Sequence, residues 1–485
     1  MIELTLAEIA AAIAGTLHLG HSGADASRTV SGPSSTDSRE VEPGGVFFAK
    51  PGETTDGHLF APQAVERGAA LLVVERELPE LAGTPQIIVP DVVVALGALA
   101  TEVVARAHAA GGLTVVGITG SNGKTTTKNL LASILRRVGE TVAPQGSFNN
   151  EVGAPITMLQ VTDATRYLVS EMGAAHVGDI ARLVRMAHPD VGVVLKVGLA
   201  HAGEYGGIEQ TALAKSEMVT ELPADGVAVL NADDHRVAAM AEKTSAGEVL
   251  WFGLGQHAPA QGAQVTARDI ELSPEGTAFT LVLPGGQSPQ DAPAARVAFK
   301  VLGEHHVMNA LAAAATAHAL GVGLADIVAG LEAVSRAERW RMEVLGGRDG
   351  ITVINDAYNA SPDSVAAALR TLAKLKRPGA RTIAVLGEMA ELGEYAGEEH
   401  DKVGLDVVVL GIDRLVAVGP GARRMHISAM REGTFFSEES QYVETPEEAY
   451  DVVMALAQPG DTILVKSSKV AGLRFLGDRL GESLS

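Results

Sequence analysis

The sequence of 485 residues contains no cysteine and no uncharged apolar run long enough to cross a membrane. Without cysteine, the chain forms no disulfide and offers no thiol nucleophile or thiolate metal ligand. A membrane-spanning helix needs about 20 mostly apolar residues. The N-terminal sequence MIELTLAEIA also lacks the basic stretch followed by an apolar one that marks a secretory signal. We therefore expect a cytoplasmic protein without a membrane partner.

Positive charge is also scarce. The 38 lysines and arginines are outnumbered by 59 aspartates and glutamates, which gives a formal net charge of −21. Because nucleic-acid backbones and many membrane surfaces are negatively charged, this balance argues against a nucleic-acid or membrane partner. An anionic ligand would need local hydrogen-bond donors and metal ions.

Glycine is abundant, with 54 residues, and hydrophobic residues make up 46% of the chain. This composition suits an α/β protein with many tight turns, and the length predicts about three domains. We place them at residues 1–112, 113–334 and 335–485. In the second domain, apolar strands alternate with helices, which predicts a mostly parallel sheet, and residues 251–302 predict antiparallel strands. In the third, the same alternation predicts a Rossmann-like sheet.

The clearest motif is LTVVGITGSNGKTTTKN at residues 113–129. An apolar strand leads into Gly120 and Gly123, around which the backbone can fold tightly and aim its N–H groups inward. A helix start near Lys124 adds free N–H groups and a partial positive charge. This pattern predicts a loop that binds the phosphates of ATP or GTP, with Lys124 on the β- and γ-phosphates and the hydroxyl of Thr125, or alternatively of Thr126, on Mg²⁺.

The spacing of this loop differs from the strict P-loop pattern, because five residues rather than four separate Gly117 from Gly123. The shorter pattern Gly-x-x-Gly-Lys-Thr fits. The alternative is a glycine-rich turn with an incidental lysine, but strand, glycines, Lys-Thr and helix occur in the order that phosphate binding requires. The predicted ATP-binding residues of the loop are Gly117, Ile118, Thr119, Gly120, Ser121, Asn122, Gly123, Lys124, Thr125 and Thr126.

Several further segments resemble the Mur ligases, and within them the members that add D-alanyl-D-alanine to UDP-N-acetylmuramoyl-tripeptide. The phosphate loop is shared by the whole superfamily, including folylpolyglutamate synthetases. The segments that resemble this branch are FNNEVGAPITML (148–159), INDAYNASPDSVAAAL (354–369) and LGEMAELGEYAGEEH (386–400), and DSR…PGGVFFAKPGETTDGHLF (37–60) resembles the UDP-sugar-binding domain.

The resemblance implies an α/β fold with a UDP-sugar-binding N-terminal domain, a P-loop ATPase-like central domain and a Rossmann-like C-terminal domain. It also implies a ligase reaction in peptidoglycan precursor synthesis. The substrate carboxylate attacks the γ-phosphate of ATP to give an acyl phosphate, and an amine then displaces phosphate. Such chemistry needs phosphate positioning and metal ions rather than covalent protein groups. The implied partners are ATP, two Mg²⁺ ions, UDP-N-acetylmuramoyl-tripeptide and D-alanyl-D-alanine.

Three candidate metal ligands follow from the resemblance: Glu171, His201 and Lys215. Glu171 ends a predicted strand, where parallel sheets place ligands, although a solvent-facing carboxylate would fit the position as well. His201 follows another strand, but a lone histidine is more often an ordinary polar residue. The segment before it departs from the family, with Lys196 in the place of the usual asparagine. Lys215 would serve as a CO₂-derived carbamate; the residues alone favour an exposed lysine on a helix.

The other candidate residues also rest on the resemblance. Arg341 fits the arginine near the ATP phosphates, with Arg339 as a rival, and Lys469 has a doubtful claim to a family arginine. His305 and His306 are adjacent on a helix and point in different directions, so we expect a structural or adenine-adjacent role. The remaining candidates are Asn149 and Asn150 for catalysis, Asn309 and Asp356 for ATP, Tyr358, Asn359 and Ser361 for the dipeptide, and Asp37, Ser38 and Arg39 for the UDP-sugar substrate.

Other functions remain open from the sequence. A sister ligase would use the same chemistry on another substrate, but the Asp-Asn-Pro-Arg segment of diaminopimelate-adding members is absent. A nucleotide-dependent switch ATPase would share the loop but leave the candidate ligands unexplained. The sequence does not tell whether the tripeptide ends in diaminopimelate or lysine, nor whether the domains are open or closed. We expect a monomer.

Overall fold

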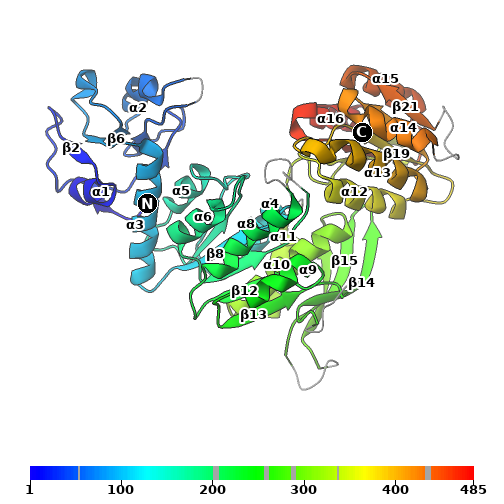
Figure 1. Ribbon diagram of the computed structural model, residues 1–485, viewed down its shortest axis with the longest axis horizontal. Coiled ribbons are helices and arrows are strands. Elements are labelled where there is room, and N and C mark those ends of the chain that lie inside the picture. The colour runs from blue at the N-terminus through cyan, green and yellow to red at the C-terminus, as the bar shows by residue number, and fades with distance from the viewer. Residues whose placement is uncertain (53–54, 200–206, 256–261, 286–290, 336–337, 432–438) are drawn as a thin grey trace.

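The chain forms three α/β domains in sequence order. The computed structural model describes residues 1–52, 55–199, 207–255, 262–285, 291–335, 338–431 and 439–485. In Figure 1 the first and third domains lie at opposite ends of the molecule, with the second between them. Each domain contains a sheet with helices packed on it, and most strand pairs of the two large sheets are parallel. The predicted fold class is confirmed.

The first domain is built on a five-stranded sheet in the order β2-β7-β6-β5-β4, and a second pair, β1-β3, lies beside it. Strands β4 to β7 pair in parallel, whereas β2 is antiparallel to β7. The strands are β1 (Leu4–Thr5), β2 (Thr16–His18), β3 (Thr29–Val30), β4 (Ser34–Ser35), β5 (Val46–Phe48), β6 (Leu71–Val74) and β7 (Gln86–Ile88), and the α-helices are α1 (Leu6–Ala12), α2 (Ala61–Glu66) and α3 (Val92–Ala109).

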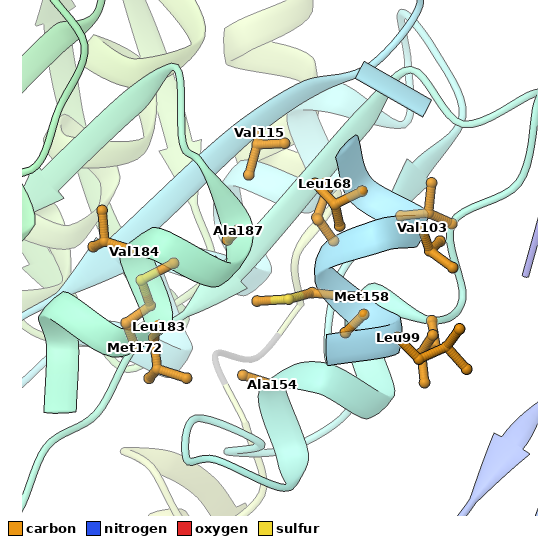
Figure 2. Close-up of a cluster of buried hydrophobic side chains, with 14 of the residues drawn as sticks. Leu99, Val103, Val115, Ala154, Met158, Leu168, Met172, Leu183, Val184 and Ala187 are labelled. Carbon is orange, nitrogen blue, oxygen red and sulfur yellow. The ribbon is translucent and has the colours of Figure 1, made fainter. Parts of the chain in front are cut away.

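Helix α3 connects the first domain to the second. It contacts α1 on one side and the central helices α5 and α6 on the other. Figure 2 shows Leu99 and Val103 of this helix among apolar side chains of the central domain, including Met158 and Leu168. Among the described residues, α3 is also the single helix long and apolar enough to span a membrane, and half of it is buried inside the fold, as in the core helix of a globular protein.

The central domain has a six-stranded parallel sheet in the order β13-β12-β11-β8-β10-β9 and a three-stranded antiparallel sheet, β14-β15-β16. The parallel strands are β8 (Thr114–Thr119), β9 (Thr141–Val142), β10 (Tyr167–Glu171), β11 (Val191–Val194), β12 (Val227–Asn231) and β13 (Glu248–Phe252). The antiparallel strands are β14 (Thr266–Ser273), β15 (Gly276–Val282) and β16 (Ala294–Phe299). The helices are α4 (Lys124–Leu135), α5 (Gly153–Met158), α6 (Asp179–Ala187), α8 (Ile208–Thr220), α9 (His235–Ala238), α10 (Glu304–Ala319) and α11 (Leu324–Ala333).

One strand of this domain was not predicted as part of the parallel sheet. Residues 251 and 252 were expected to open the antiparallel segment, but they end β13, which pairs in parallel with β12. The reason is burial. Because Leu250, Trp251 and Phe252 are all buried, this short apolar run joins the buried parallel sheet rather than the more exposed antiparallel one. The antiparallel strands begin at Thr266 instead.

The third domain contains a six-stranded sheet in the order β17-β18-β22-β19-β20-β21, in which β17 is antiparallel to β18 and the other pairs are parallel. The strands are β17 (Glu343–Gly346), β18 (Thr352–Asn355), β19 (Thr382–Leu386), β20 (Arg414–Val418), β21 (Ser440–Val443) and β22 (Thr462–Lys466). The helices are α12 (Pro362–Lys374), α13 (Ala396–Val409), α14 (Arg423–Arg431), α15 (Pro446–Leu456) and α16 (Leu473–Ser483). The edge strands β17 and β21 were not predicted because they are short and half exposed.

Candidate active site

A cleft of about 750 Å³ lies between the central and C-terminal domains, and the predicted phosphate loop forms its floor. The loop connects β8 to α4, and residues 120–126 all line the cleft. Gly123 begins α4 in the left-handed region, with φ of 87°, and a Cβ at this position would come within 2.3 Å of Oδ1 of Asn309. Only glycine therefore fits at the helix start, which leaves the N–H groups of its first turn accessible.

Lys124 is the cation of this loop. Its Nζ donates to the carbonyl oxygen of Gly120 at 2.8 Å, so the side chain folds back over the loop. Burial lowers the pKa of Lys124, and the carboxylate of Glu171 acts in the opposite direction. The loop thus presents a desolvated amine next to a row of backbone N–H groups, which is suited to a phosphate chain.

Three of the residues predicted for the loop lie below it. Gly117, Ile118 and Thr119 are buried within β8 and do not line the cleft. The hydroxyl of Thr119 donates to the carbonyl oxygen of Met172 at 2.8 Å, which ties β8 to the end of β10. Their geometry supports the loop from beneath, and direct contact with ATP remains a prediction for them.

Glu171 lies at the carboxyl end of β10 and is fully buried. Its Oε1 accepts hydrogen bonds from the hydroxyl of Ser147 and from the side-chain amide of Asn149, both at 2.8 Å. Its Oε2 is buried without a hydrogen-bond partner. Because a buried carboxylate oxygen is costly to leave bare, this atom fits a cation ligand, and a solvent-facing strand end is ruled out.

Two threonines of the loop differ in their surroundings. Thr125 Oγ1 lies 3.4 Å from the hydroxyl of Ser147, which itself contacts Glu171. Thr126 is equally buried and also lines the cleft. Thr125 is therefore connected to the carboxylate network, which favours it over Thr126 as the hydroxyl near a metal ion. Ser147 was not predicted as a site residue, because the sequence around it carries no pattern beyond the neighbouring asparagines.

Lys215 lies in α8 and lines the same cleft. It is buried, with 4% of its surface exposed, so the alternative of an exposed lysine on a helix face is wrong. Burial lowers its pKa to about 7, and the positive charge of Lys124 contributes to the shift. The third candidate ligand, His201, lies outside the described residues.

The segment after Ser147 contributes two asparagines to the cleft wall. Asn149 is bonded to Glu171, as described above, whereas Asn150 acts locally: its Oδ1 accepts from the N–H groups of Gly153 and Val152 near the start of α5. Beside them lies a charged cluster that the sequence did not reveal. Arg182 of α6 contacts Asp179 at 2.6 Å and Glu151 at 3.3 Å, and all three residues line the cleft.

Helix α10 places a polar group on another side of the cleft. The side-chain nitrogen of Asn309 lies 3.3 Å from Nδ1 of His306, and both residues are buried. Burial lowers the pKa of His305 to about 4 and moves that of His306 well below its ordinary value, so both rings are neutral at pH 7. Nδ1 of His305 and Nε2 of His306 have no hydrogen-bond partner, which leaves two polar ring atoms for a ligand.

The C-terminal domain supplies an arginine to the cleft. Arg341 lines it, and its guanidinium group lies 4.4 Å from the ring centre of Tyr358. Its Nε is buried without a hydrogen-bond partner. Arg339 instead contacts Asp478 at 2.9 Å outside the cleft. The geometry thus favours Arg341 over its rival as the phosphate-side arginine.

Asp356 lies beyond β18 and forms a buried ion pair with Lys466, at 2.6 Å. Its other oxygen accepts from the backbone N–H of Met342 at 3.0 Å, which ties it to the residue after Arg341. Lys466 is a cleft residue that the sequence did not single out, although its place at the end of β22 is the place where a parallel sheet presents ligands. Lys469, by contrast, is exposed and outside the cleft.

The turn between β18 and α12 completes this wall. Tyr358, Asn359 and Ser361 all line the cleft, and the hydroxyl of Ser361 lies 3.1 Å from Oδ1 of Asn122 in the phosphate loop. The predicted substrate residues of the first domain are elsewhere: Asp37, Ser38 and Arg39 lie between β4 and β5 and do not line the cleft. There Arg39 pairs with Asp37 at 2.6 Å, and Ser38 donates to Gln63 at 2.5 Å.

The chain matches known proteins over nearly its whole length. Residues 34–103 match the Mur ligase family catalytic domain, residues 118–317 the Mur ligase middle domain and residues 340–469 the Mur ligase glutamate ligase domain. The UDP-N-acetylmuramoyl-tripeptide--D-alanyl-D-alanine ligase of Mycobacterium tuberculosis is 42% identical over 99% of this chain and 98% of its own length. The ligase of that name from Escherichia coli is 34% identical over 100% of this chain and 99% of its own length.

Solved structures of similar proteins have the same fold as this chain. The MurF crystal structure from Acinetobacter baumannii superposes with a TM-score of 0.84 at 32% identity and covers 99% of both chains. The MurF ligase from Thermotoga maritima in complex with ADP gives a TM-score of 0.78 at 26% identity, over 94% of this chain and 98% of that one. At such identity over almost the whole length, the chain belongs to the Mur ligase family and is of the MurF type.

Proposed function

We propose that the chain joins D-alanyl-D-alanine to UDP-N-acetylmuramoyl-tripeptide and converts ATP to ADP and phosphate in cytoplasmic peptidoglycan precursor synthesis. The observation that carries this proposal is one cleft that combines a phosphate loop with Glu171 and Lys215, closed on its far side by a second domain. The names of relatives that match over nearly the whole chain supply the substrates.

The reaction proceeds in two transfers. A carboxylate oxygen of the tripeptide forms a bond to the γ-phosphorus of ATP, and the bond between that phosphorus and the β,γ-bridging oxygen breaks to release ADP. The amine of the dipeptide then attacks the carbonyl carbon of the acyl phosphate, and the tetrahedral adduct loses phosphate and a proton. The N–H groups of the loop and Lys124 orient and neutralise the phosphates in the first transfer.

Magnesium fits the donor set at the floor of the cleft. The bare Oε2 of Glu171 and the hydroxyl of Thr125 are oxygen ligands of the kind that Mg²⁺ prefers, and His201 is proposed as a further ligand. The ion supplies charge neutralisation at the phosphate oxygens. We propose two such ions and a carbamate on Lys215, for which the lowered pKa gives support, because only an unprotonated amine attacks CO₂.

The remaining candidate residues are assigned to the other parts of the substrates. We propose that Asn309, with the neutral His306, binds the adenine ring, and that Arg341 and Asp356 contact the phosphate and ribose side of ATP. The 358–361 turn would orient the dipeptide, and Asp37, Ser38 and Arg39 would bind the UDP-sugar end from the first domain. We further propose domain boundaries after residues 112 and 334, and a monomeric enzyme.

The test is a phosphate-release assay with ATP, Mg²⁺ and UDP-N-acetylmuramoyl-tripeptide, with D-alanyl-D-alanine or single amino acids added in turn. Release that requires the dipeptide, together with a product heavier by the dipeptide minus water, is the expected result. Tripeptides ending in diaminopimelate and in lysine are compared in parallel. Release with a single amino acid would indicate a sister ligase, and release without any carboxylate or amine substrate would indicate a switch ATPase.

A further inference from the structure

An ion pair joins the central domain to the C-terminal domain beside the phosphate loop. Nζ of Lys196, two residues beyond β11, lies 2.7 Å from Oδ1 of Asp363, the second residue of α12. The two side chains are 43% and 33% exposed, so the pair is partly shielded from water. Lys196 occupies the position where the resemblance to Mur ligases leads one to expect asparagine, so this charge is a departure by this chain.

Lys196 is also in direct contact with the phosphate loop through its backbone. Its carbonyl oxygen accepts from the N–H of Ser121 at 2.8 Å. The hydroxyl of the same serine donates to the carbonyl oxygen of Gly198 at 3.1 Å and accepts from the N–H of Gly198 at 2.9 Å. These hydrogen bonds hold the loop and the segment 196–198 together, so a displacement of one is expected to move the other.

The carboxylate of Asp363 lies directly against this segment. The two groups are in close approach: a Cβ at Gly198 would come within 2.3 Å of Oδ2 of Asp363. A second contact lies nearby, between the hydroxyl of Ser361 and Asn122 of the loop. The start of α12 thus contacts the phosphate loop directly at Asn122 and the adjoining segment 196–198 at Lys196, immediately after the turn that carries Tyr358 and Asn359.

We propose that Lys196 is a positioning residue for the ligase reaction. Through its ion pair with Asp363, it fixes the 358–361 turn of the C-terminal domain over the phosphate loop in the closed arrangement that the second transfer requires. Neither charge lines the cleft that contains Lys124 and Glu171; both line an adjoining cleft together with Asn122 and Gly123 of the loop, so we assign the pair an action through the loop and the turn. The kinetic test of this inference rests on the proposed function, whereas the test by measured interdomain distance does not.

The kinetic test compares Lys196→Met, Asp363→Asn and the charge-reversed double variant Lys196→Glu/Asp363→Lys with the unchanged enzyme. Each single variant is expected to lower kcat about two- to fivefold, with a smaller change in KM for ATP, and the double variant to recover most of the loss. Because exposed ion pairs are screened by salt, added salt should lower kcat of the unchanged enzyme but not of Lys196→Met.

A matched control is available in a second ion pair between the same domains. Lys374 of α12 contacts Glu304 of α10 at 2.5 Å, with similar exposure, but neither residue contacts the phosphate loop or lines the cleft. Lys374→Met should leave kcat and its salt dependence close to those of the unchanged enzyme. If kcat falls equally in Lys196→Met and Lys374→Met, ion pairs between these two domains contribute to kcat wherever they lie. That result would overturn the specific role of Lys196.

A conformational test does not depend on ligase activity. Because the chain has no cysteine, two dyes can be attached to cysteines introduced at the exposed positions Lys243 and Glu447, in the central and C-terminal domains. With ATP and Mg²⁺ present, Lys196→Met should show a smaller population at the short dye distance, and the double variant should restore it. Unchanged distances and kcat in folded Lys196→Met, or no recovery in the folded double variant, would refute the proposal. Absence of ligation by the unchanged chain would instead refute the proposed function.

Discussion

The side-chain amide of Asn149 donates to Oε1 of Glu171 at 2.8 Å, while Oε2 of the same carboxylate is buried without a partner. The hydroxyl of Ser147 donates to Oε1 as well. Two donors on one oxygen fix the carboxylate plane and direct the other oxygen, which is how outer hydrogen bonds orient a metal ligand. In the proposed metal site, the asparagine would therefore act through Glu171 rather than by direct ligation.

Replacing Asn149 by alanine should reduce metal binding. Without this amide, only Ser147 still donates to Oε1, so Glu171 is held less firmly, and we expect a roughly 10- to 100-fold higher Mg²⁺ concentration for half-maximal activity. The measurement is ligation rate against Mg²⁺ concentration. Asn149→Leu is the sharper variant, because it nearly keeps the size of the side chain, removes the donor and adds no charge. Full Mg²⁺ affinity in Asn149→Leu would show that the hydrogen bond to Glu171 is not what orients the ligand.

The two arginines before β17 provide a second comparison. Arg341 stacks on Tyr358 within the cleft, whereas Arg339 pairs with Asp478 outside it. We expect Arg341→Met to raise KM for ATP about tenfold or more, since the guanidinium proposed to contact phosphate is lost. Arg341→Lys should recover little, because an ammonium group does not reproduce the planar stacking. Arg339→Met is the matched control, and an effect on KM as large as that of Arg341→Met would contradict the assignment.

Lys215 predicts a dependence on CO₂. Its amine must be unprotonated to form a carbamate, and its pKa of about 7 means that the neutral fraction rises about tenfold between pH 6 and pH 8. Enzyme stripped of CO₂ at low pH should have low activity and regain it on addition of bicarbonate, more rapidly at pH 8 than at pH 6. Enzyme treated with ¹³C-bicarbonate should show a carbamate carbon signal by NMR.

The control for this experiment is Lys215→Arg, which keeps the positive charge but cannot form the carbamate. It should show neither the bicarbonate response nor the ¹³C signal. If the unchanged enzyme is equally active without CO₂ and gives no carbamate signal, Lys215 acts as an amine. The positive charge of Lys124 would then have to be balanced by a group other than a carbamate on Lys215.

Much of the fold was predictable because its signals are local. The alternation of buried strands and helices and the Gly-x-x-Gly-Lys-Thr loop lie within short windows of sequence, and the structure shows β8, the loop and α4 as expected. The edge strand β13 was assigned to the wrong segment because a short apolar run does not reveal the sheet to which it belongs.

The site was predictable only in part, since its residues come from distant segments. Sequence reasoning found Glu171 and Lys215 through family resemblance, but not Ser147, which connects Thr125 to Glu171, nor Lys466, which lies 110 residues from its partner Asp356. Contacts at such separation exist only after the domain that contains them has folded: the Ser147 contacts lie within the central domain, and the Lys466–Asp356 pair lies within the C-terminal domain. The clustering of Arg182, Asp179 and Glu151 likewise depends on α6 packing beside the 149–153 segment.

A final prediction concerns the stability of the first domain. Glu8 completes a capping box with Thr5 at the start of α1 and contacts Arg106 of α3 at 2.8 Å. The backbone N–H of Thr5, and next Arg106, lower the pKa of Glu8 from 4.5 to about 2. The group binds a proton less readily in the folded state, so its stabilising contribution is complete above the unfolded pKa of about 4.5 and is lost as pH falls toward 2.

At neutral pH, the start of α1 should therefore be less stable in the Glu8→Gln variant than in the unchanged protein. This difference in stability should shrink as the solution becomes acidic. Hydrogen exchange of the α1 amides, expressed as protection relative to the unfolded chain, measures this locally without assuming that three domains unfold together. Glu102→Gln is the matched control, because Glu102 contacts the same Arg106 at 2.6 Å but caps no helix. We expect it to leave the protection of α1 nearly unchanged. Equal loss of protection in the two variants would assign the effect to the charge on Arg106 rather than to the negative charge of Glu8 at the start of α1.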